Sequence, residues 1–336
     1  MSRLYELLVE YKQLGIPDQI DYDKLYLYSI ITHSTAVEGS TITEIENRLM
    51  FDEGISPDKS IDEQLMNLDL KCAYERAKEL AKNHTDYTVE LLCQLAGLVM
   101  KNTGTEYKTL TGNFSSANGD LRRVNVTAGR DGKSYMSYQK VPQRLEDFCV
   151  WLNERRKRIS QKDIDEIYEL SFMVHYNLVS IHPWADGNGR MSRLLMNMVQ
   201  IEYDVVPSIV KREGRDAYIK SLAKSQDDED PKFFIDYMID HHVKNLEDSI
   251  SEFKRTTEND TLNLKNDTLN DTINLSEKES VILELIKGNT DISITEIVEI
   301  TGFGRATVTR AIKALKENQL IDRVGAKKNG HWVVME

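Results

Sequence analysis

The residues of this sequence that are best placed to do chemistry together lie in one short run. Residues 182–190 read His-Pro-Trp-Ala-Asp-Gly-Asn-Gly-Arg, and Arg193 follows three positions later. Gly187 and Gly189 flank Asn188, and backbone N–H groups that no Cβ obstructs can form a nest for phosphate oxygens. A helix that begins here would add its positive end to that nest. The run therefore predicts a binding site for an anionic ligand.

Charged side chains flank the predicted nest. Arg190 and Arg193 lie three positions apart, so on a helix both guanidinium groups can reach one polyphosphate. Asp186 comes just before the nest and is an oxygen ligand for a divalent cation that would bridge phosphate oxygens. His182 is the group here that can take a proton near neutral pH. Together these residues predict a base, a metal ligand and two clamps around a polyphosphate.

Apolar residues on both sides of the run predict the two helices that position it. Residues 164–179 have helical apolar spacing and lead into the run. After the run, Met191, Leu194, Leu195 and Met198 recur with the spacing of one buried helical face. The run is therefore expected to be a loop between two buried helices.

This loop resembles the signature of the Fic family, His-x-Phe-x-Asp/Glu-Gly-Asn-Gly-Arg-x-x-Arg. Trp184 stands where the signature usually has Phe, and one buried aromatic residue in place of another should disturb packing more than chemistry. Every chemically active position matches. The resemblance implies a mostly α-helical, Fic-type bundle with a small β-hairpin.

The resemblance also implies an activity, which is Mg²⁺-dependent transfer of AMP from ATP to a Ser, Thr or Tyr hydroxyl of a target protein or of the protein itself. The hydroxyl would attack the α-phosphate, and pyrophosphate would leave. Gly189 leaves room for the β- and γ-phosphates, which favours AMP transfer over the phosphorylation seen in one branch of the family. The implied roles are base for His182, Mg²⁺ ligand for Asp186, phosphate cradle for Gly187, Asn188 and Gly189, and β- and γ-phosphate contacts for Arg190 and Arg193.

A second motif lies near the N-terminus. Residues 21–37 are predicted as a helix, Ser34 and Glu38 share one face of it, and Gly39 suits a helix end. The pattern Ser-x-x-x-Glu-Gly resembles the inhibitory motif of Fic proteins, Ser/Thr-x-x-x-Glu-Gly/Asn. The resemblance implies that Glu38 pairs with Arg193 and blocks the productive position of the γ-phosphate. Without the Fic signature, the same residues would indicate an ordinary solvated helix end.

Between residues 112 and 138 the sequence changes from helical to strand periodicity. Turn clusters at 118–120 and 129–133 bracket the alternating residues 121–127, so a β-hairpin is expected. In Fic proteins the corresponding hairpin is the flap, which holds the target segment by pairing along a strand edge. A hairpin that only closes the helical core is the alternative. The residues that the resemblance implies for target binding are Val124, Asn125, Val126 and Thr127.

The C-terminal residues 275–336 predict a separate compact module. Three short helices are followed by two strands around the basic turn 325–330, and this pattern resembles a winged helix-turn-helix. Phosphate contacts from its basic face would give DNA affinity that falls with salt. Winged helices also serve as protein-binding modules, which is the alternative. The predicted DNA contacts are Arg305, Thr309, Arg310, Lys313, Lys327 and Lys328.

The expected domains are an N-terminal helical region over 1–110 with its inhibitory helix at about 21–38, a Fic catalytic core over 111–255, a polar linker over 256–274 and the winged helix. In the linker, Asn-Asp-Thr-Leu-Asn occurs twice. Asn and Asp are weak helix formers, which favours an irregular segment. The alternative is a short self-association seam, which would make a second copy of this chain a partner. That seam would use Leu262, Leu269 and Ile273.

Composition and charge agree with a two-domain protein of 336 residues. The formal net charge is −12, but residues 276–336 hold nine basic and nine acidic residues, so the excess acid belongs to the rest of the chain. No apolar run approaches the roughly 18 residues needed to span a bilayer, and the N-terminus lacks a secretory pattern. Cys72, Cys93 and Cys149 are predicted to be reduced core thiols. We therefore expect a cytoplasmic protein with no membrane partner.

Two other functions fit the same residues. The chain would be a DNA-binding transcriptional regulator if its Fic domain binds ATP as a sensor without chemistry. It would remove AMP from a modified target if Glu38 positions a water molecule.

Overall fold

The structure is a computed structural model, which describes residues 2–127, 134–267, 277–290, 292–301, 303–317, 320–324 and 331–334. The chain forms two compact units, Met1–Arg255 and Thr256–Glu336. Both the signature loop, residues 182–190, and the predicted inhibitory motif belong to the first unit. In the described part of the chain, no helix combines the length and the apolar character that crossing a bilayer requires.

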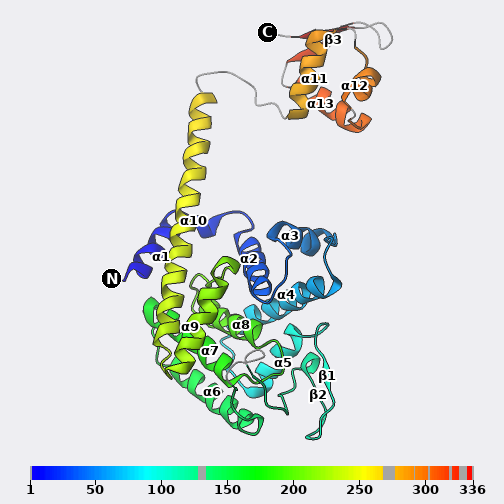
Figure 1. Cartoon of the computed structure of the whole chain (residues 1–336). Coiled ribbons are helices and arrows are strands. Elements are labelled where there is room, and N and C mark those ends of the chain that lie inside the picture. The colour runs from blue at the N-terminus through cyan, green and yellow to red at the C-terminus, as the bar shows by residue number, and fades with distance from the viewer. Residues whose placement is uncertain are drawn as a thin grey trace. The chain divides into compact units, whose positions relative to one another are not determined.

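Helices build almost all of the first unit (Figure 1). Its helices are α1 (Arg3–Gln13), α2 (Tyr22–Val37), α3 (Glu44–Glu53), α4 (Ile61–Lys82), α5 (Val89–Val99), α6 (Val141–Arg156), α7 (Ile164–Ile181), α8 (Asn188–Glu202), α9 (Arg215–Asp227) and the start of α10 (Lys232–Asp267). Its short strands are β1 (Glu106–Tyr107) and β2 (Phe114–Ser115), and its 3-10 turns are η1 (Ile16–Asp18), η2 (Ser116–Asn118), η3 (Tyr138–Lys140) and η4 (Arg212–Gly214).

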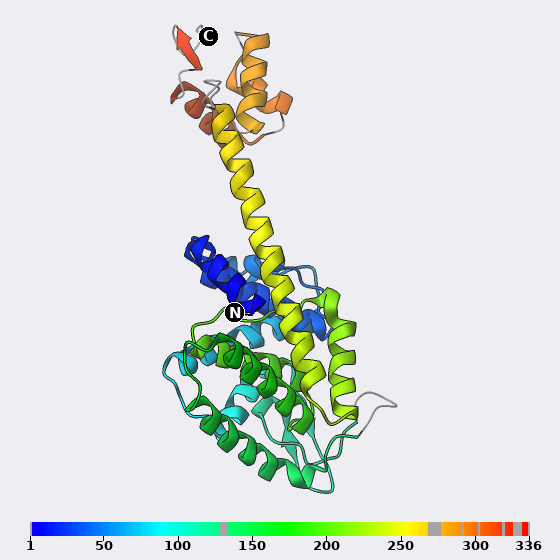
Figure 2. The ribbon, with the colours of Figure 1, turned by 90° about the vertical axis from the view of Figure 1, so that its left-hand side faces the viewer.

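Helices α7 and α8 form the centre of this unit, and both views of the ribbon place them side by side (Figures 1 and 2). The apolar face predicted for α8 is confirmed, because Met191, Leu194, Leu195 and Met198 are all buried. Each fully buried side chain of this size contributes roughly 1.5–3 kcal/mol to stability. Other helices cover the remaining sides of α8, so the loop that precedes it is held by a rigid element.

The polar side chains of α8 that are buried in the core make hydrogen bonds there. The Tyr74 hydroxyl donates to Asn197 Oδ1 at 2.7 Å, and Asn197 Nδ2 donates to the Ser208 carbonyl at 2.9 Å. Gln200 Nε2 donates to the Ser171 and Ser208 hydroxyls at 2.9 and 3.0 Å. Buried polar groups cost free energy unless they are paired in this way, so these bonds set one position for α8.

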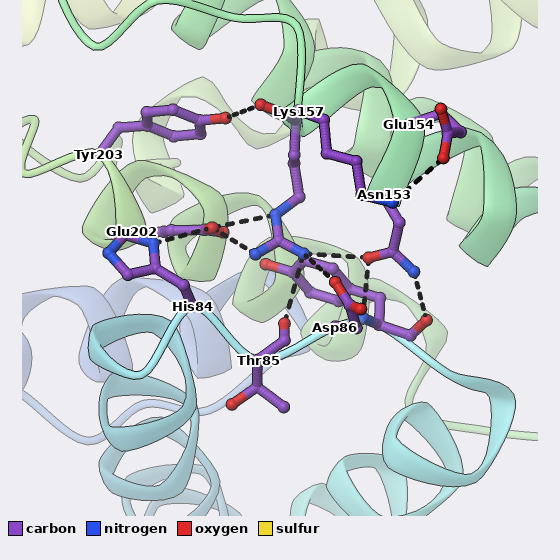
Figure 3. A network of polar contacts seen from close by, with 10 residues as sticks. His84, Thr85, Asp86, Asn153, Glu154, Lys157, Glu202 and Tyr203 are labelled. Carbon is purple, nitrogen blue, oxygen red and sulfur yellow. Dashed lines mark hydrogen bonds and ion pairs between the residues drawn. The ribbon is translucent and has the colours of Figure 1, made fainter.

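A network of polar contacts holds the last turn of α8 (Figure 3). Glu202 is buried and accepts hydrogen bonds from the Arg156 guanidinium, and His84 Nδ1 lies 3.2 Å from the same carboxylate oxygen. Arg156 also donates to Asn153 Oδ1 at 3.0 Å, and the Tyr203 hydroxyl donates to the Arg156 carbonyl at 2.9 Å. This network fixes the end of α8 that lies away from the signature loop.

A second polar cluster holds the end of α2, where the inhibitory motif lies. Asn67 Oδ1 on α4 accepts hydrogen bonds from the Thr35 hydroxyl and from Asn47 Nδ2, both at 2.9 Å. Asn67 Nδ2 donates to Ser40 Oγ at 3.2 Å and to the Glu63 carbonyl at 2.8 Å. Since Ser40 follows Glu38 by two residues, Asn67 fixes the chain on both sides of the predicted inhibitory residue.

The hairpin predicted around residues 121–138 is much shorter in the structure. Residues 121–126 are not a strand; a single bridge joins Thr127 to Ser134, with a hydrogen bond of 3.1 Å from the Tyr135 N–H to the Val126 carbonyl. A physical reason is that the Arg122 side chain takes the Val124 and Met136 carbonyls, one on each side of the predicted hairpin. A small antiparallel sheet forms instead from β1 and β2, which were not predicted.

The second unit has the order of elements predicted for a winged helix. It contains α11 (Glu277–Gly288), α12 (Ile294–Thr301), α13 (Arg305–Glu317) and the antiparallel strands β3 (Ile321–Val324) and β4 (His331–Val334). Its own core includes Val308, Ile312 and Leu315 of α13, as predicted. Lys327 and Lys328, which were predicted to contact DNA from the turn between the strands, lie outside the described residues.

The irregular linker predicted to begin at residue 256 is wrong for its first part. Helix α10 continues to Asp267, through the first Asn-Asp-Thr-Leu-Asn segment. Its earlier turns are anchored by the buried side chains of Phe234 and Met238, and extending an existing helix costs far less than nucleating a new one. Leu269 and Ile273 of the alternative seam lie outside the described residues.

The three cysteines are free thiols but differ in exposure. Cys149 is buried, which raises the pKa of its thiol to about 12. Cys93 is partly buried, whereas Cys72 is exposed on α4, so the prediction that all three are core thiols is wrong for Cys72. The apolar neighbours of Cys72 in the sequence lie on the other face of the same helix.

Replacing Asn67 with Ala should destabilise the protein because Thr35, Asn47 and Ser40 would lose a buried partner. We expect the free energy of unfolding to fall by about 2–3 kcal/mol, measured by urea denaturation. Asn83→Ala, at the exposed end of the same helix, should change it by less than about 0.5 kcal/mol. Equal effects of the two substitutions would contradict the role of Asn67.

Candidate active site

The signature loop joins α7 to α8 through two residues in left-handed backbone conformation. His182 ends α7 with a φ of 51°, and Gly187 precedes α8 with a φ of 80°. Gly187 is required at its position because a left-handed φ strains other residues and because a Cβ there would lie 2.7 Å from Met100 Sδ. Helix α8 begins at Asn188, so its first N–H groups, which have no acceptor within the helix, face the loop.

Two side chains within the loop hold its shape. Asn188 Oδ1 accepts from the Trp184 N–H at 3.1 Å, and Asn188 Nδ2 donates to the Trp184 carbonyl at 2.8 Å. The Trp184 ring is buried, and its Nε1 donates to the Gly119 carbonyl at 3.0 Å. Asn188 therefore shapes the nest with its side chain, leaving its backbone N–H for a ligand, and Trp184 anchors the loop to the bundle.

Arg122 ties the predicted flap to the signature loop. Its guanidinium donates to the carbonyls of His182 at 2.7 Å, Val124 at 2.8 Å and Met136 at 2.6 Å. Its own N–H donates to the Pro183 carbonyl at 3.0 Å. Burial lowers the pKa of this guanidinium. Sequence reasoning missed this residue because Arg122 was assigned to an alternating strand, where a buried arginine has no signal of its own.

The predicted base, His182, lies against an aromatic ring. The imidazole stacks on the Tyr135 ring with centroids 3.8 Å apart and planes inclined by 18°. Burial lowers the pKa of His182 to about 4, and the positive charge of Arg122 acts in the same direction. The imidazole is therefore neutral at pH 7 and can accept a proton, as a general base must.

The structure brings Arg193 together with both residues of the second motif. Arg193 Nη2 lies 2.6 Å from Glu38 Oε1 and donates to the Ser34 carbonyl at 2.9 Å, while its Nε donates to Ser34 Oγ at 2.9 Å. The Arg193 side chain is only 3% exposed, and that of Glu38 is 35% exposed. The ion pair is thus buried on the arginine side and open on the carboxylate side.

The Glu38 carboxylate also lies against the first turn of α8. A Cβ built on Gly189 would be 2.5 Å from Glu38 Oε1 and 3.2 Å from Arg193 Nη1. The start of a helix favours negative charge. Burial acts to raise the pKa of Glu38, but Arg193, Arg190 and Arg215 outweigh it and hold that pKa below its usual value. An ionised carboxylate therefore lies at the start of α8, beside Gly189.

Arg190 and Asp186 line the same end of α8. Arg190 is buried, and its Nη2 lies 3.0 Å from Met100 Sδ and 3.8 Å from Asp186 Oδ1. Asp186 has 60% of its side chain exposed, and its Oδ1 accepts the Gly187 N–H at 2.6 Å. The carboxylate paired with Arg190 is that of Asp186, at 3.8 Å and largely exposed, so the charge of Arg190 can also serve a ligand.

Sequence reasoning gave no role to Tyr218, which the structure places beside Arg193. The Tyr218 hydroxyl lies 3.5 Å from Arg193 Nη1 and 2.7 Å from His175 Nε2. Burial lowers the pKa of His175 well below its usual value, so this ring is neutral. Tyr218 thus contacts the Nη1 side of the Arg193 guanidinium, and Glu38 contacts the Nη2 side.

The predicted flap residues make several different contacts and do not form one strand. Val124 and Val126 use their carbonyls within the segment, to Arg122 and to Tyr135, and Asn125 Oδ1 accepts the Tyr138 N–H at 3.0 Å. Thr127 forms the single bridge to residue 134. The segment therefore borders the signature loop, but no continuous strand edge is present among its described residues.

In the second unit, Arg305, Thr309, Arg310 and Lys313 all lie on α13 and are exposed. The Thr309 hydroxyl donates to the Arg305 carbonyl at 2.9 Å. These four residues make up much of the exposed part of the helix, whereas Val308, Ile312 and Leu315 are buried. They make a basic exposed face on the element that corresponds to a recognition helix.

A cavity of the first unit lies away from the signature loop. A space of about 620 Å³ is bordered by the first half of α2 and the end of α8, with Tyr22, Tyr26 and Pro207 among its lining residues. It contains no residue of the signature loop. At the nest, the Glu38 carboxylate lies in the space beside Gly189.

Comparison with protein families agrees with this geometry. Residues 86–200 match the Fic/DOC family, and residues 273–330 match the MarR family. Residues 86–200 therefore form a Fic/DOC family domain, and the C-terminal unit is a MarR-like winged helix.

Related proteins point the same way. The chain is 28% identical to protein adenylyltransferase fic-1 of Caenorhabditis elegans over 238 aligned residues. The alignment covers 70% of this chain and 42% of that protein. It is 27% identical to protein adenylyltransferase Fic of Drosophila melanogaster over 222 aligned residues. That alignment covers 65% of this chain and 41% of that protein. The chain thus spans less than half the length of these relatives.

Solved structures share the fold. A Fic domain containing signaling protein from Bacteroides thetaiotaomicron superposes with a TM-score of 0.61 at 19% identity, over 75% of this chain and 97% of that one. A Fic family protein from Desulfovibrio desulfuricans superposes with a TM-score of 0.55 at 16% identity, over 100% of this chain and 96% of that one.

The state of the His182 ring can be measured directly. Since burial lowers its pKa to about 4, its NMR signals should stay those of a neutral imidazole on acidification from pH 8 to pH 5.5. His182→Asn assigns the signal. A His182 pKa of 6 or above would contradict the burial seen here.

The lowered pKa also predicts how His182 affects stability. The unfolded chain binds the proton near pH 6.5 and the folded chain only near pH 4. The stabilising contribution of the neutral ring is therefore complete above about pH 6.5 and is lost as the pH falls toward 4.

Proposed function

We propose that this protein transfers AMP from ATP to a hydroxyl side chain of a target protein, and that Glu38 inhibits the reaction. The observation that carries this proposal is the position of the Glu38 carboxylate, which lies against Gly189 and pairs with Arg193. A nest that already holds one anion is suited to another, and Arg193 is placed to bind it. The relatives named protein adenylyltransferase support the reaction class.

In this proposal the phosphates bind along the start of α8. The N–H groups of Asn188, Gly189 and Arg190 bind phosphate oxygens, and the Arg190 and Arg193 side chains neutralise the β- and γ-phosphates. Glu38 competes for the same arginine and puts a like charge beside the γ-phosphate. ATP would then bind with its α-phosphate misplaced for attack until Glu38 moves away.

On the acceptor side, His182 takes the proton of the attacking hydroxyl. The His182 imidazole is neutral, and His182 is the residue that ends α7, directly before the nest. A hydroxyl that approaches the free nitrogen of this ring would therefore also approach the α-phosphate. The bond that forms joins the hydroxyl oxygen to the α-phosphorus, and the bond that breaks releases pyrophosphate. The flap segment that Arg122 ties to the loop would hold the target chain nearby.

The residues present fit a Mg²⁺ ion that arrives with the nucleotide. Asp186 offers an exposed carboxylate beside the nest, and Arg190 at 3.8 Å leaves it open to further ligands. No cluster of three or more metal-binding side chains occurs in the parts of the chain that the structure describes, so phosphate oxygens and water must complete the coordination. Mg²⁺ held there would neutralise charge on the phosphates.

Replacing Glu38 with Gly should raise AMP incorporation, because it removes the anion from the nest and frees Arg193. We expect an increase of roughly tenfold or more in label transferred from α-labelled ATP to target proteins or to the chain itself, since each tenfold corresponds to about 1.4 kcal/mol. Adding His182→Ala to the Glu38→Gly variant should abolish it.

The matched control is Glu53→Gly, which removes an exposed glutamate of α3 and should leave incorporation unchanged. Equal or lower incorporation by Glu38→Gly would contradict inhibition by this residue. If Glu38 instead orients water for removal of AMP, the substitution would slow release of label from a modified target. Nucleotide binding without any transfer would favour a sensor.

We also propose that the second unit binds DNA. The match of residues 273–330 to the MarR family and the exposed basic side of α13 support this proposal. A helix of this kind enters the major groove while basic side chains contact phosphates. DNA binding and AMP transfer would then lie on separate units of one chain.

Charge reversal on α13 tests the DNA proposal. The double variant Arg305→Glu, Arg310→Glu should weaken DNA binding at least about tenfold, and the slope of log affinity against log salt should become less steep by roughly two units. Fluorescence anisotropy at several salt concentrations measures both. Lys287→Glu on α11 is the control and should have a much smaller effect. Unchanged DNA affinity in the double variant would exclude this face.

A further inference from the structure

The ring of Tyr135 covers one face of the His182 imidazole. Their centroids are 3.8 Å apart and their planes are inclined by only 18°, which is a close stacked contact. Tyr135 itself is partly buried. The chemistry proposed above needs a base that is neutral and correctly oriented, but it does not by itself require an aromatic ring at this position.

The orientation of a histidine ring is usually set by a hydrogen bond to the nitrogen that does not react. In His182, Nδ1 is buried and lies near the Val179 carbonyl, which favours the protonated ring, but no hydrogen bond of regular geometry joins the two. The stack with Tyr135 is a second contact on the ring, and it restrains the ring through its face.

The backbone on which Tyr135 lies is tied to the backbone of His182. Arg122 donates from Nη2 to the carbonyl of Met136, the next residue, and from Nε to the carbonyl of His182. The Tyr135 N–H donates to the Val126 carbonyl at 3.1 Å. One buried guanidinium thus links the two backbone segments that carry the stacked rings.

We propose that Tyr135 is a positioning residue for the proposed reaction, and that its ring holds the His182 imidazole so that the reactive nitrogen faces the incoming hydroxyl. The stack contacts the face of the imidazole, whereas the nitrogen lone pair lies in the plane of the ring and points past its edge. Tyr135 therefore restrains the base without blocking it. This inference rests on the proposed role of His182 as the base.

The same ring also shields the imidazole from water. The charged groups that act on His182 are Arg122, which disfavours its protonation, and Glu38, which favours it. Burial has the largest effect on the pKa of His182, and Tyr135 covers one face of the His182 ring. Removing Tyr135 should therefore free the ring to rotate and should let it bind a proton at higher pH.

The test compares Tyr135→Ala and Tyr135→Phe in the full-length Glu38→Gly background, where AMP transfer is expected to be measurable. Tyr135→Ala should lower kcat by roughly ten- to a hundredfold while the KM for ATP stays within about twofold, because misplacing a base affects the chemical step. Tyr135→Phe keeps the stack and should restore kcat. Tyr138→Ala, three residues away and without a ring contact to His182, is the matched control.

The pH profile separates positioning from general loosening of the fold. Tyr135→Ala should move the acidic limb of kcat upward, toward the usual histidine value of about 6.5, so its defect should be larger at pH 5.5 than at pH 8. Tyr135→Phe should keep the acidic limb of its parent. Tyr135→Ala with an unchanged kcat, or with a lowered kcat and an unmoved acidic limb, would overturn the proposal.

NMR titration of the His182 ring gives a readout that does not depend on activity. The pKa should rise in Tyr135→Ala and should stay near that of the parent in Tyr135→Phe, and an unchanged pKa in Tyr135→Ala would overturn the proposal. If Glu38→Gly transfers no AMP at any pH, the proposed function fails, and the catalytic role of Tyr135 fails with it. A raised pKa in Tyr135→Ala would then still show that Tyr135 holds and shields the ring.

Discussion

The ion pair between Glu38 and Arg193 is the contact on which the functional interpretation of this structure depends. It joins the end of α2 to the first turns of α8, and it does so at Gly189, where a side chain would collide with the carboxylate. A buried arginine requires a compensating anion. Glu38 supplies that anion in this structure, and in the proposed function a phosphate would replace it. In the proposed function, inhibition by Glu38 and binding of ATP phosphates would therefore both satisfy this electrostatic requirement of Arg193.

The rest of the first unit keeps this site in place from several directions. The network around Glu202 fixes the far end of α8, and Asn67 fixes the chain on both sides of Glu38. Within the loop, Asn188 and Trp184 bond to each other, and Arg122 bonds the flap segment to the His182 carbonyl. Because these anchors are buried and paired, a change at Glu38 can alter the nest without reshaping the loop.

The sequence was informative where local pattern decides structure. The apolar spacing of α8 predicted its buried face, and the signature and inhibitory motifs pointed to the residues that meet around Arg193. The sequence did not predict the structure of segments that depend on contacts with residues far away in the chain. The strand predicted near Val124 is nearly absent because Arg122 takes the carbonyls, and α10 runs to Asp267 because an anchored helix propagates through weak formers. The ring contact of Tyr135 leaves no pattern in the sequence at all.

The most direct test of the central claim is the position of the γ-phosphate in a crystal structure of the Glu38→Gly variant with Mg²⁺ and α,β-methylene ATP, which cannot release pyrophosphate. We predict that the γ-phosphate lies beside Gly189, in the space that the Glu38 carboxylate occupies here, and accepts hydrogen bonds from Arg193. A nucleotide whose γ-phosphate lies outside the nest, with Arg193 still bonded only to Ser34 and Tyr218, would contradict the claim.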